Sequence, residues 1–375
     1  MISAFRPSYL EIDLDRLEHN ISNIKSYLAG QAQLMGVLKA DAYGTGAVEI
    51  ARFLGDRLDL IGVATLVEAL ELRQAGIEKD ILILGYIELN HIEELVRQDI
   101  VQTIYSYGDA EKISQEAVRQ KKLARVHIKI NTGMNRLGLD PGPEALEVIR
   151  KIRGLENLEV QGIFSHFLDA ENRDKSICHR QFKVFRDFLD LLAGQSMSFQ
   201  YEHICNSAGL MDLEDYYLDL VRAGIILYGI YPENVRRELV DLEFIASLKS
   251  RISDIREIGP GDYVGYSRGF RADRPMKLAV IGLGYADGYS EEIRAKIKPR
   301  IGDQEISVVG NICMDQTILD VTNIEGLKRG DLVTLFDSRD RDDFDIAWLS
   351  QISRRVPRNY IQKNKLLKSR SYLLD

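Results

Sequence analysis

The sequence predicts an α/β + β fold, in which a (β/α)8 barrel of the TIM type is followed by a mostly antiparallel β domain. Two observations indicate this fold. Short apolar segments alternate with helical patterns over the first part of the chain, as parallel strands joined by helical crossovers do. From about Asp241 the chain changes to short alternating segments between glycine and aspartate turns. We therefore divide it into a barrel at residues 1–240 and a β domain at 241–375, with the first strand (about 8–14) a candidate for packing with the β domain.

The chain opens with the alternating segment 9–14, which predicts a short strand. Asp13 or Asp15 is the candidate N-cap of a helix, because apolar residues follow it in the sequence at helical spacing. These apolar residues are Leu17, Ile21, Ile24 and Leu28. Further helices are predicted at 65–75, which Gly76 ends, and at 182–192.

Eight apolar segments are the candidates for barrel strands. They are residues 35–38, 60–64, 81–84, 101–105, 126–130, 160–164, 203–205 and 221–228. An open doubly wound sheet is the alternative, but it would usually carry a Gly-x-Gly-x-x-Gly fingerprint, and none follows the first strand.

The β domain is predicted from a long alternating segment at 247–258, which ends in the turn 259–262. Shorter strands are expected at 277–283, 306–309, 317–321 and 332–335. One helix is expected at 346–354.

The formal charge of −8 argues against a nucleic-acid or acidic-membrane partner. The three cysteines, Cys178, Cys205 and Cys313, are odd in number and far apart, which favours reduced thiols over disulfides. The sequence has no signal-peptide pattern and no apolar run of membrane-spanning length. We therefore expect a soluble cytoplasmic protein. No metal site is expected, and a zinc hydrolase is a weak hypothesis because no His-Glu-x-x-His pair occurs.

Lys39 lies at the end of the first apolar segment. An amine in that position loses hydration, which favours its neutral, nucleophilic form and condensation with an aldehyde. An ordinary strand-end lysine is the simpler alternative. Active sites of such barrels lie at the C-terminal ends of the strands. The polar residues at the other strand ends are Asn131 to Arg136, Ser165 and His166, Asn206 and Ser207, and Arg222 to Gly224. A phosphate site near Ser207 and Gly224, together with a reactive lysine on the first strand, suggests pyridoxal phosphate.

The chain resembles the alanine racemases, which are fold-type III pyridoxal-phosphate enzymes. The matching motifs, in order, are KADAYG at 39–44, HIKINTGMNRLG at 127–138, GIFSHF at 162–167, NSAG at 206–209, VRAGIILYG at 221–229, VGY at 264–266, GYADGY at 284–289, CMDQT at 313–317 and RVPR at 355–358. The resemblance implies an amino-acid racemase, an isomerase, most simply one that interconverts L- and D-alanine and supplies D-alanine for peptidoglycan.

The resemblance implies that Lys39 holds the cofactor and acts as one proton-transfer base, while Tyr266 acts from the opposite face. A tyrosine is a poor base at neutral pH unless nearby cations lower its pKa, and the pair His166 and Arg222 is implied in that role. Arg222 is also expected to face the pyridine nitrogen of the cofactor. The simpler alternatives are that Tyr266 is an aromatic residue of a β-hairpin and that Arg222 forms an ion pair at the surface.

The resemblance also implies that Arg136 pairs with the substrate carboxylate or with the phenolic oxygen of the cofactor. It further implies that the backbone amide of Met314 lies near the substrate, and that Lys129 is carbamylated. The phosphate would be held by Tyr43, Ser207 and the amides of Gly224 and Ile225. The simpler alternatives are a core methionine for Met314, a lysine snorkelling to the barrel rim for Lys129, and a helix N-cap for Ser207.

Because Tyr266 and Met314 belong to the β domain, the resemblance implies a head-to-tail homodimer with shared active sites. Departures from the family pattern at Thr45, Asn131, Glu292 and Arg354 leave substrate choice open, so a serine or broader-specificity racemase is an alternative. A fold-type III amino-acid decarboxylase and a pyridoxal-phosphate carrier built on the barrel alone are the remaining hypotheses. The decarboxylase is disfavoured because the chain has no Gly-Gly pair.

Overall fold

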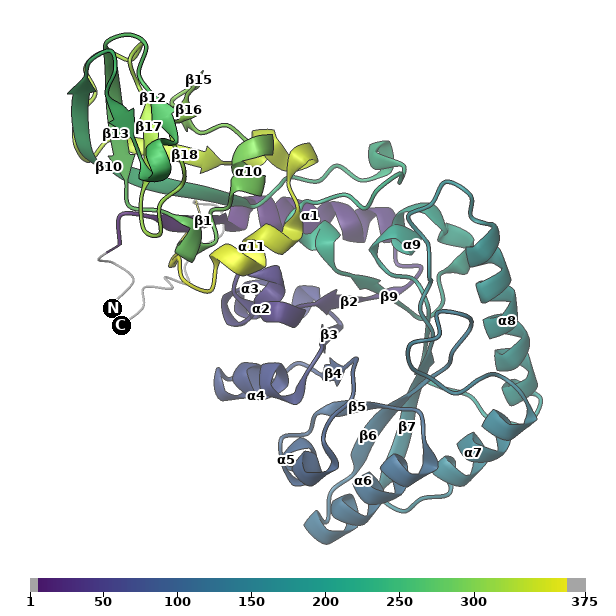
Figure 1. Cartoon of the computed structure of the whole chain (residues 1–375). Helices are drawn as coiled ribbons and strands as arrows, with labels where there is room; N and C mark the ends of the chain where they lie inside the picture. Colours follow the sequence, from purple (N-terminus) through teal and green to yellow (C-terminus); the bar gives the residue numbers. More distant parts are fainter. Residues whose placement is uncertain (1–5, 363–375) are drawn as a thin grey trace.

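In the computed structural model, which describes residues 6–362, a barrel and a β domain lie side by side (Figure 1). Residues 1–5 and 363–375, which the sequence-based division assigns to the two parts, lie outside the described residues. The predicted fold class is confirmed. Within the described residues, no helix combines the length and the apolar character that crossing a membrane requires.

The barrel is a parallel sheet with the order β8-β7-β6-β5-β4-β3-β2-β9. Its strands are β2 (Gln33–Val37), β3 (Leu60–Val63), β4 (Ile81–Ile83), β5 (Val101–Ile104), β6 (Ala124–Lys129), β7 (Leu158–Phe164), β8 (Tyr201–His203) and β9 (Leu220–Ala223). The two ends meet through backbone hydrogen bonds, in which Asp219 N–H donates to the Glu202 carbonyl and Arg222 N–H to the Cys205 carbonyl, both at 3.1 Å. These bonds close the sheet, so the open doubly wound alternative is wrong.

Helices follow the strands around the outside of the barrel (Figure 1). They are α1 (Leu14–Leu28), α3 (Ala47–Leu54), α4 (Leu66–Gln74), α5 (Ile92–Arg97), α6 (Tyr107–Gln120), α7 (Pro143–Arg153), α8 (Ser176–Ala193) and α9 (Ser207–Asp212). The short α2 (Lys39–Tyr43), which contains left-handed residues, follows β2 at the mouth of the barrel. Asp13 is the cap of α1, because its carboxylate accepts from the backbone N–H groups of Asp15 and Arg16.

The last barrel strand is shorter than the sequence predicts. The strand expected at 221–228 ends at Ala223, and the 3-10 helix η5 (Ile225–Tyr228) follows. Gly224 lies between them at φ −106° and ψ −105°, so the chain leaves the sheet at this residue. This break brings residues 224 and 225 to the mouth of the barrel.

The β domain is built on a nine-stranded sheet in which β15, β14, β18, β10, β13, β17 and β16 lie in that order. Its strands are β10 (Ala246–Ile258), β13 (Met276–Ile281), β14 (Arg300–Ile301), β15 (Gln304–Glu305), β16 (Ser307–Val308), β17 (Thr317–Asp320), β18 (Leu332–Phe336), β19 (Arg358–Ile361) and β1 (Tyr9–Asp13). A separate hairpin of β11 (Tyr263–Val264) and β12 (Phe270–Arg271), and the helices α10 (Glu291–Lys296) and α11 (Ile346–Ile352), complete it.

The two ends of the described chain meet in this sheet. The first strand, β1, pairs antiparallel with β10 and parallel with β19, with Leu10 opposite both Leu248 and Arg358. Helix α11 lies against α2 at the mouth of the barrel (Figure 1). One apolar core contains residues of both parts, so the β domain braces the start of the barrel.

Candidate active site

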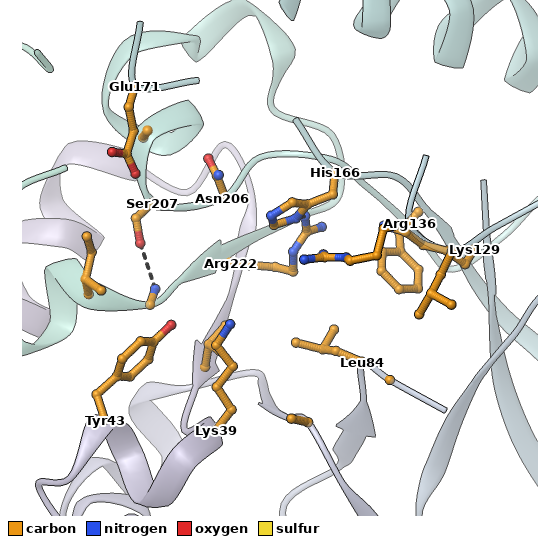
Figure 2. Close-up of a pocket in the computed structure, with 18 residues that line it drawn as sticks. Lys39, Tyr43, Leu84, Lys129, Arg136, His166, Glu171, Asn206, Ser207 and Arg222 are labelled. Atoms are coloured by element: carbon orange, nitrogen blue, oxygen red, sulfur yellow. Dashed lines mark hydrogen bonds between the residues drawn. The ribbon is translucent and has the colours of Figure 1, made fainter. Parts of the chain in front are cut away.

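A cavity of about 350 Å³ opens at the C-terminal ends of the barrel strands. It brings together nine of the eleven residues that the sequence singled out, and Figure 2 shows several of them pointing into the same space. The nine are Lys39, Tyr43, Lys129, Arg136, His166, Ser207, Arg222, Gly224 and Ile225. Tyr266 and Met314 do not line this cavity.

Lys39 begins a turn that wraps in the left-handed sense. The next four residues, Ala40 to Tyr43, all have φ between 52° and 56°. Each non-glycine residue in that region costs about 1–3 kcal/mol, so other contacts must hold the turn. The Glu68 carboxylate supplies one, because it accepts from the backbone N–H of Ala40 at 2.7 Å, while its other oxygen accepts from the N–H of Ala64 after β3, also at 2.7 Å.

Residues of strand β19, in the sheet of the β domain, also bind this turn. The Arg358 guanidinium pairs with the Asp41 carboxylate and donates from Nε to the Gly44 carbonyl at 2.9 Å. The Tyr360 hydroxyl donates to the Thr45 carbonyl at 2.8 Å. The β domain therefore fixes the backbone that follows Lys39.

Replacing Arg358 by alanine should lower the free energy of unfolding by about 1–2 kcal/mol, because the Gly44 carbonyl and the Asp41 carboxylate lose a charged donor. Urea denaturation measures this change. Arg256→Ala is the control, since it removes a solvent-exposed ion pair with Asp254 and should change stability by less than about 0.5 kcal/mol. Equal effects of the two substitutions would show that Arg358 does not brace the turn.

The cavity is strongly cationic. Lys39, Lys129, Arg136 and Arg222 line it, and Glu171 is the one acidic residue that does so among residues 6–362. Burial, followed by the Arg136 charge, lowers the pKa of Lys39. Burial, helped by the cations of Arg222 and Arg136, holds the pKa of Lys129 well below its usual range. The cavity therefore favours anions and keeps neutral amines available.

Arg222 is buried with 3% of its surface exposed, so the surface ion-pair alternative is wrong. Its Nη1 contacts His203 Nδ1 at 2.7 Å, and its Nη2 contacts His166 Nδ1 at 2.8 Å. Nη2 also donates to the carbonyls of Ser165 and Ile204, at 3.0 and 2.8 Å. Burial lowers the pKa of Arg222 to about 10, which leaves the guanidinium protonated at neutral pH.

Lys129 is also buried, with 7% exposure, so it does not snorkel to the rim. Its Nζ lies 4.1 Å from the centroid of the Phe164 ring. The ring face attracts a cation, but the burial of the amine and the nearby Arg222 and Arg136 cations disfavour an ammonium more strongly.

On another wall, Ser207, Tyr43 and Gly224 form a small polar cradle. Gly224 N–H donates to Ser207 Oγ at 2.8 Å (Figure 2). A Cβ at position 224 would lie 3.1 Å from Tyr43 Oη and 3.4 Å from Ser207 Oγ, so a side chain there would crowd the cradle. Ser207 is the first residue of α9 and not its cap. Asn206 is the cap, because its Oδ1 accepts from Gly209 N–H at 2.9 Å.

Comparison with known proteins identifies the family. Residues 12–232 match the model of the alanine racemase N-terminal domain, and residues 245–362 match that of the alanine racemase C-terminal domain. The chain belongs to the alanine racemase family. Its resemblance to these enzymes is therefore confirmed over both parts of the chain, and the protein is an enzyme of this pyridoxal-phosphate-using, isomerase family.

Full-length relatives agree with this assignment. An alanine racemase of Clostridium kluyveri is 39% identical over 389 aligned residues, which cover 100% of this chain and 99% of the relative. An alanine racemase of Helicobacter pylori is 39% identical, covering 94% of this chain and 95% of the relative. Among solved structures, alanine racemase of Clostridium difficile matches with a TM-score of 0.91 at 36% identity, covering 99% and 100% of the two chains. Alanine racemase of Bacillus anthracis, solved with bound L-Ala-P, has a TM-score of 0.87 at 26% identity, with 97% of each chain covered.

The two site residues that the resemblance to alanine racemases placed in the β domain line a hollow of their own. Tyr266 and Met314 contribute to it together with Gly265, Cys313, Asp315 and Gln316. Tyr266 is 71% exposed and Met314 is 53% exposed, so Met314 is not a core methionine. The backbone around Met314 is held by the 284–286 segment, where Tyr285 N–H donates to the Cys313 carbonyl and Ala286 N–H to the Met314 carbonyl.

Asn131 organises the loop that carries Arg136. Its Nδ2 donates to Asn135 Oδ1 at 3.0 Å and to Asp140 Oδ1 at 2.8 Å. Its Oδ1 accepts from the N–H groups of Gly133 and Asn135. An aspartate could accept these last two bonds but could not donate the first two.

We expect Asn131→Asp to lower the free energy of unfolding by about 1–2 kcal/mol, because it sets two carboxylates against each other where a hydrogen bond stood. Urea denaturation of the single variants and of the double variant Asn131→Asp/Asp140→Asn tests this. The double variant should recover most of the loss, because the amide introduced at position 140 then supplies the missing donor. If it is no more stable than Asn131→Asp, the interpretation of the loop is wrong.

Several residues of the site were missed from the sequence. Glu68 had a readable signal, since it stands three residues after Thr65 in a capping box. Phe164 and His203 lie beside Arg222, and their rings stack with centroids 4.6 Å apart. They belong to predicted strands, but nothing in the strand pattern marked them as neighbours of the site.

Proposed function

We propose that this enzyme interconverts L- and D-alanine with pyridoxal 5'-phosphate as its cofactor. The observation that supports this most directly is the placing of a desolvated lysine, a buried arginine and a small polar cradle around one cationic cavity. A serine or broader-specificity racemase of the same family is the second candidate, since Asn131 and Thr45 depart from the common family pattern.

The residues present fit the cofactor. A Cβ at residue 224 would crowd Tyr43 Oη and Ser207 Oγ, so the missing side chain helps to keep the cradle open for an oxyanion. We propose that these residues and the Ile225 amide hold the phosphate, that Lys39 holds the aldehyde carbon, and that Arg222 faces the pyridine nitrogen. When bound, the cofactor withdraws the negative charge that forms when the substrate loses its Cα proton.

The side chains then divide the proton transfer between two faces. Lys39 moves the Cα proton on one face, and Tyr266 moves it on the other, which is what inversion at Cα requires. Arg136 binds the substrate carboxylate or the phenolic oxygen of the cofactor, and the Met314 backbone amide contacts the substrate. Because Arg222 donates to His166 Nδ1, the neutral imidazole carries its proton on Nε2 and can donate it to the oxygen of Tyr266.

The depressed pKa of Lys129 supports our proposal that this lysine is carbamylated. A neutral amine adds to carbon dioxide and releases one proton, and the product is an anion among the cations of the cavity. The resulting carbamate would orient Arg136 by a charge-assisted pair.

We further propose a homodimer in which Tyr266 and Met314 of the partner subunit close the barrel mouth. Their exposure in a hollow separate from the Lys39 cavity supports this arrangement. We also propose that the barrel ends at residue 240 and that the β domain begins at residue 241. The enzyme would make D-alanine for peptidoglycan.

The experiment that tests the function is incubation of the enzyme with a panel of L-amino acids, followed by chiral chromatography. We expect D-alanine as the main product, and equal amounts of both enantiomers at equilibrium. D-serine in excess would favour the second candidate. Release of an amine and carbon dioxide, without any D-amino acid, would show a decarboxylase and contradict the proposal.

A further inference from the structure

A chain of hydrogen bonds runs through the barrel interior from Arg222 toward the N-terminal end of the strands. Arg222 Nη1 contacts His203 Nδ1 at 2.7 Å, and His203 Nε2 contacts His127 Nδ1 at 3.1 Å. His127 Nε2 contacts Gln161 Oε1 at 3.4 Å, and Gln161 Nε2 contacts Gln200 Oε1 at 3.4 Å. Both imidazoles are fully buried and Gln161 is 5% exposed, whereas Gln200 reaches the surface.

The direction of every bond in this chain follows from its first member. An arginine has only donors, so His203 Nδ1 must accept and the proton of a neutral His203 lies on Nε2. That proton is donated to His127 Nδ1, so His127 carries its own proton on Nε2. The Nε2–H of His127 requires an acceptor, and the carbonyl oxygen of the Gln161 amide is the atom that it meets.

This argument requires both imidazoles to be neutral. Burial is the largest cause that lowers the pKa of His127, to about 4, and it also holds the pKa of His203 well below its usual range. After burial, the Arg222 cation is the largest cause that lowers the pKa of His203, and Lys129 adds to it. At His127 the Arg125 and Arg222 cations lower the pKa, whereas the hydrogen bond to Gln161 and the Asp80 carboxylate oppose them. Aromatic rings flank the pair, since Phe164 stacks on His203 and Tyr201 on His127.

We propose that Gln161 is a positioning residue for Arg222. By accepting from His127 Nε2–H, its amide oxygen stabilises, from the far end of the barrel, the same tautomers that the Arg222 donor requires, so that His203 keeps a bare Nδ1 to hold the guanidinium. The position of Arg222 against the cofactor therefore depends on both ends of the chain of hydrogen bonds. This inference rests on the proposed cofactor site, but the tautomer chain itself does not.

Long-range proton–nitrogen NMR of the histidines in the holoenzyme tests the chain directly. We expect His127 and His203 both to be protonated on Nε2 and bare on Nδ1 at neutral pH. Protonation of either ring on Nδ1 would overturn the inference, whatever reaction the enzyme catalyses.

The role of Gln161 is tested by Gln161→Leu, which has a similar volume but no acceptor. We expect Nδ1–H forms of His127 and His203 to appear, and the affinity of the cofactor-free protein for added pyridoxal 5'-phosphate to fall about 10-fold, as for a lost hydrogen bond to a charged group. Gln200→Leu is the matched control, because Gln161 keeps its oxygen there, and it should change neither measurement. If Gln161→Leu folds, racemises alanine and keeps the wild-type tautomers and affinity, the inference fails while the proposed function stands. If it does not fold, the tautomers of the unaltered enzyme still decide the matter.

Discussion

Tyr266→Phe should bind the cofactor as the unaltered enzyme does and yet racemise alanine at least about 100-fold more slowly. The substitution removes one hydroxyl and keeps the ring. Because the side chain is 71% exposed in the single chain, its loss should leave folding unchanged. The backbone at this position is fixed independently, since Gly269 N–H and the Asn311 amide both donate to the Tyr266 carbonyl.

Chiral chromatography of initial rates in both directions, beside the cofactor content, measures this effect. Tyr263→Phe is the control, because Tyr263 is also exposed in the same hairpin region and contacts Arg268 and Arg271 by its ring face. The Tyr263→Phe variant should keep nearly the full racemase activity of the unaltered enzyme. A Tyr266→Phe variant with normal turnover would contradict the assignment of two bases.

Lys39→Ala should abolish covalent retention of the cofactor and lower racemisation by about 1,000-fold or more, because in our proposal this one group supplies both the attachment and a base. Borohydride treatment of the unaltered enzyme should attach the cofactor to the peptide that contains Lys39, which mass spectrometry can locate. Lys183→Ala is the control, since Lys183 lies on the exposed face of α8 in an ion pair with Asp187. Labelling of another lysine in the unaltered enzyme would place the cofactor elsewhere.

The pH dependence of this labelling follows from the environment of Lys39. Burial and the Arg136 cation lower its pKa, so a larger fraction of the amine is neutral at a given pH than in a free peptide. Labelling of the cofactor-free protein should therefore begin at a lower pH than labelling of a peptide lysine. The opposite order would show that Lys39 is solvated when the cofactor is absent.

Much of the fold was predictable because the barrel strands are short apolar segments at regular spacing, and because Asp13 stands where α1 needs a cap. The left-handed turn after Lys39 was not predictable, since the alanines at 40 and 42 and the tyrosine at 43 do not favour positive φ. That turn exists because Glu68 and Arg358, distant in sequence, hold it. The short β9 has a similar explanation, because tertiary contacts at Gly224 override a continuous apolar pattern.

The sequence predicted those residues of the candidate site that lie at the C-terminal ends of barrel strands. The burial of Arg222 and its contact with His203 depend on the closure of the sheet between β8 and β9, which no local pattern encodes. The place of Tyr266 depends on the association of two chains in our proposal, so neither the sequence pattern nor a single chain brings it to Lys39.

Complementation between two inactive variants tests that central claim most directly. Lys39→Ala and Tyr266→Phe chains carrying different tags are produced together, and the mixed dimers are isolated by both tags. In a mixed dimer, one site has both defects, while the other combines Lys39 of one chain with Tyr266 of the partner subunit. We expect mixed dimers to recover about half of the unaltered activity per dimer, while each parent homodimer stays inactive. Isolated mixed dimers with no more activity than the parents would contradict a site shared between subunits.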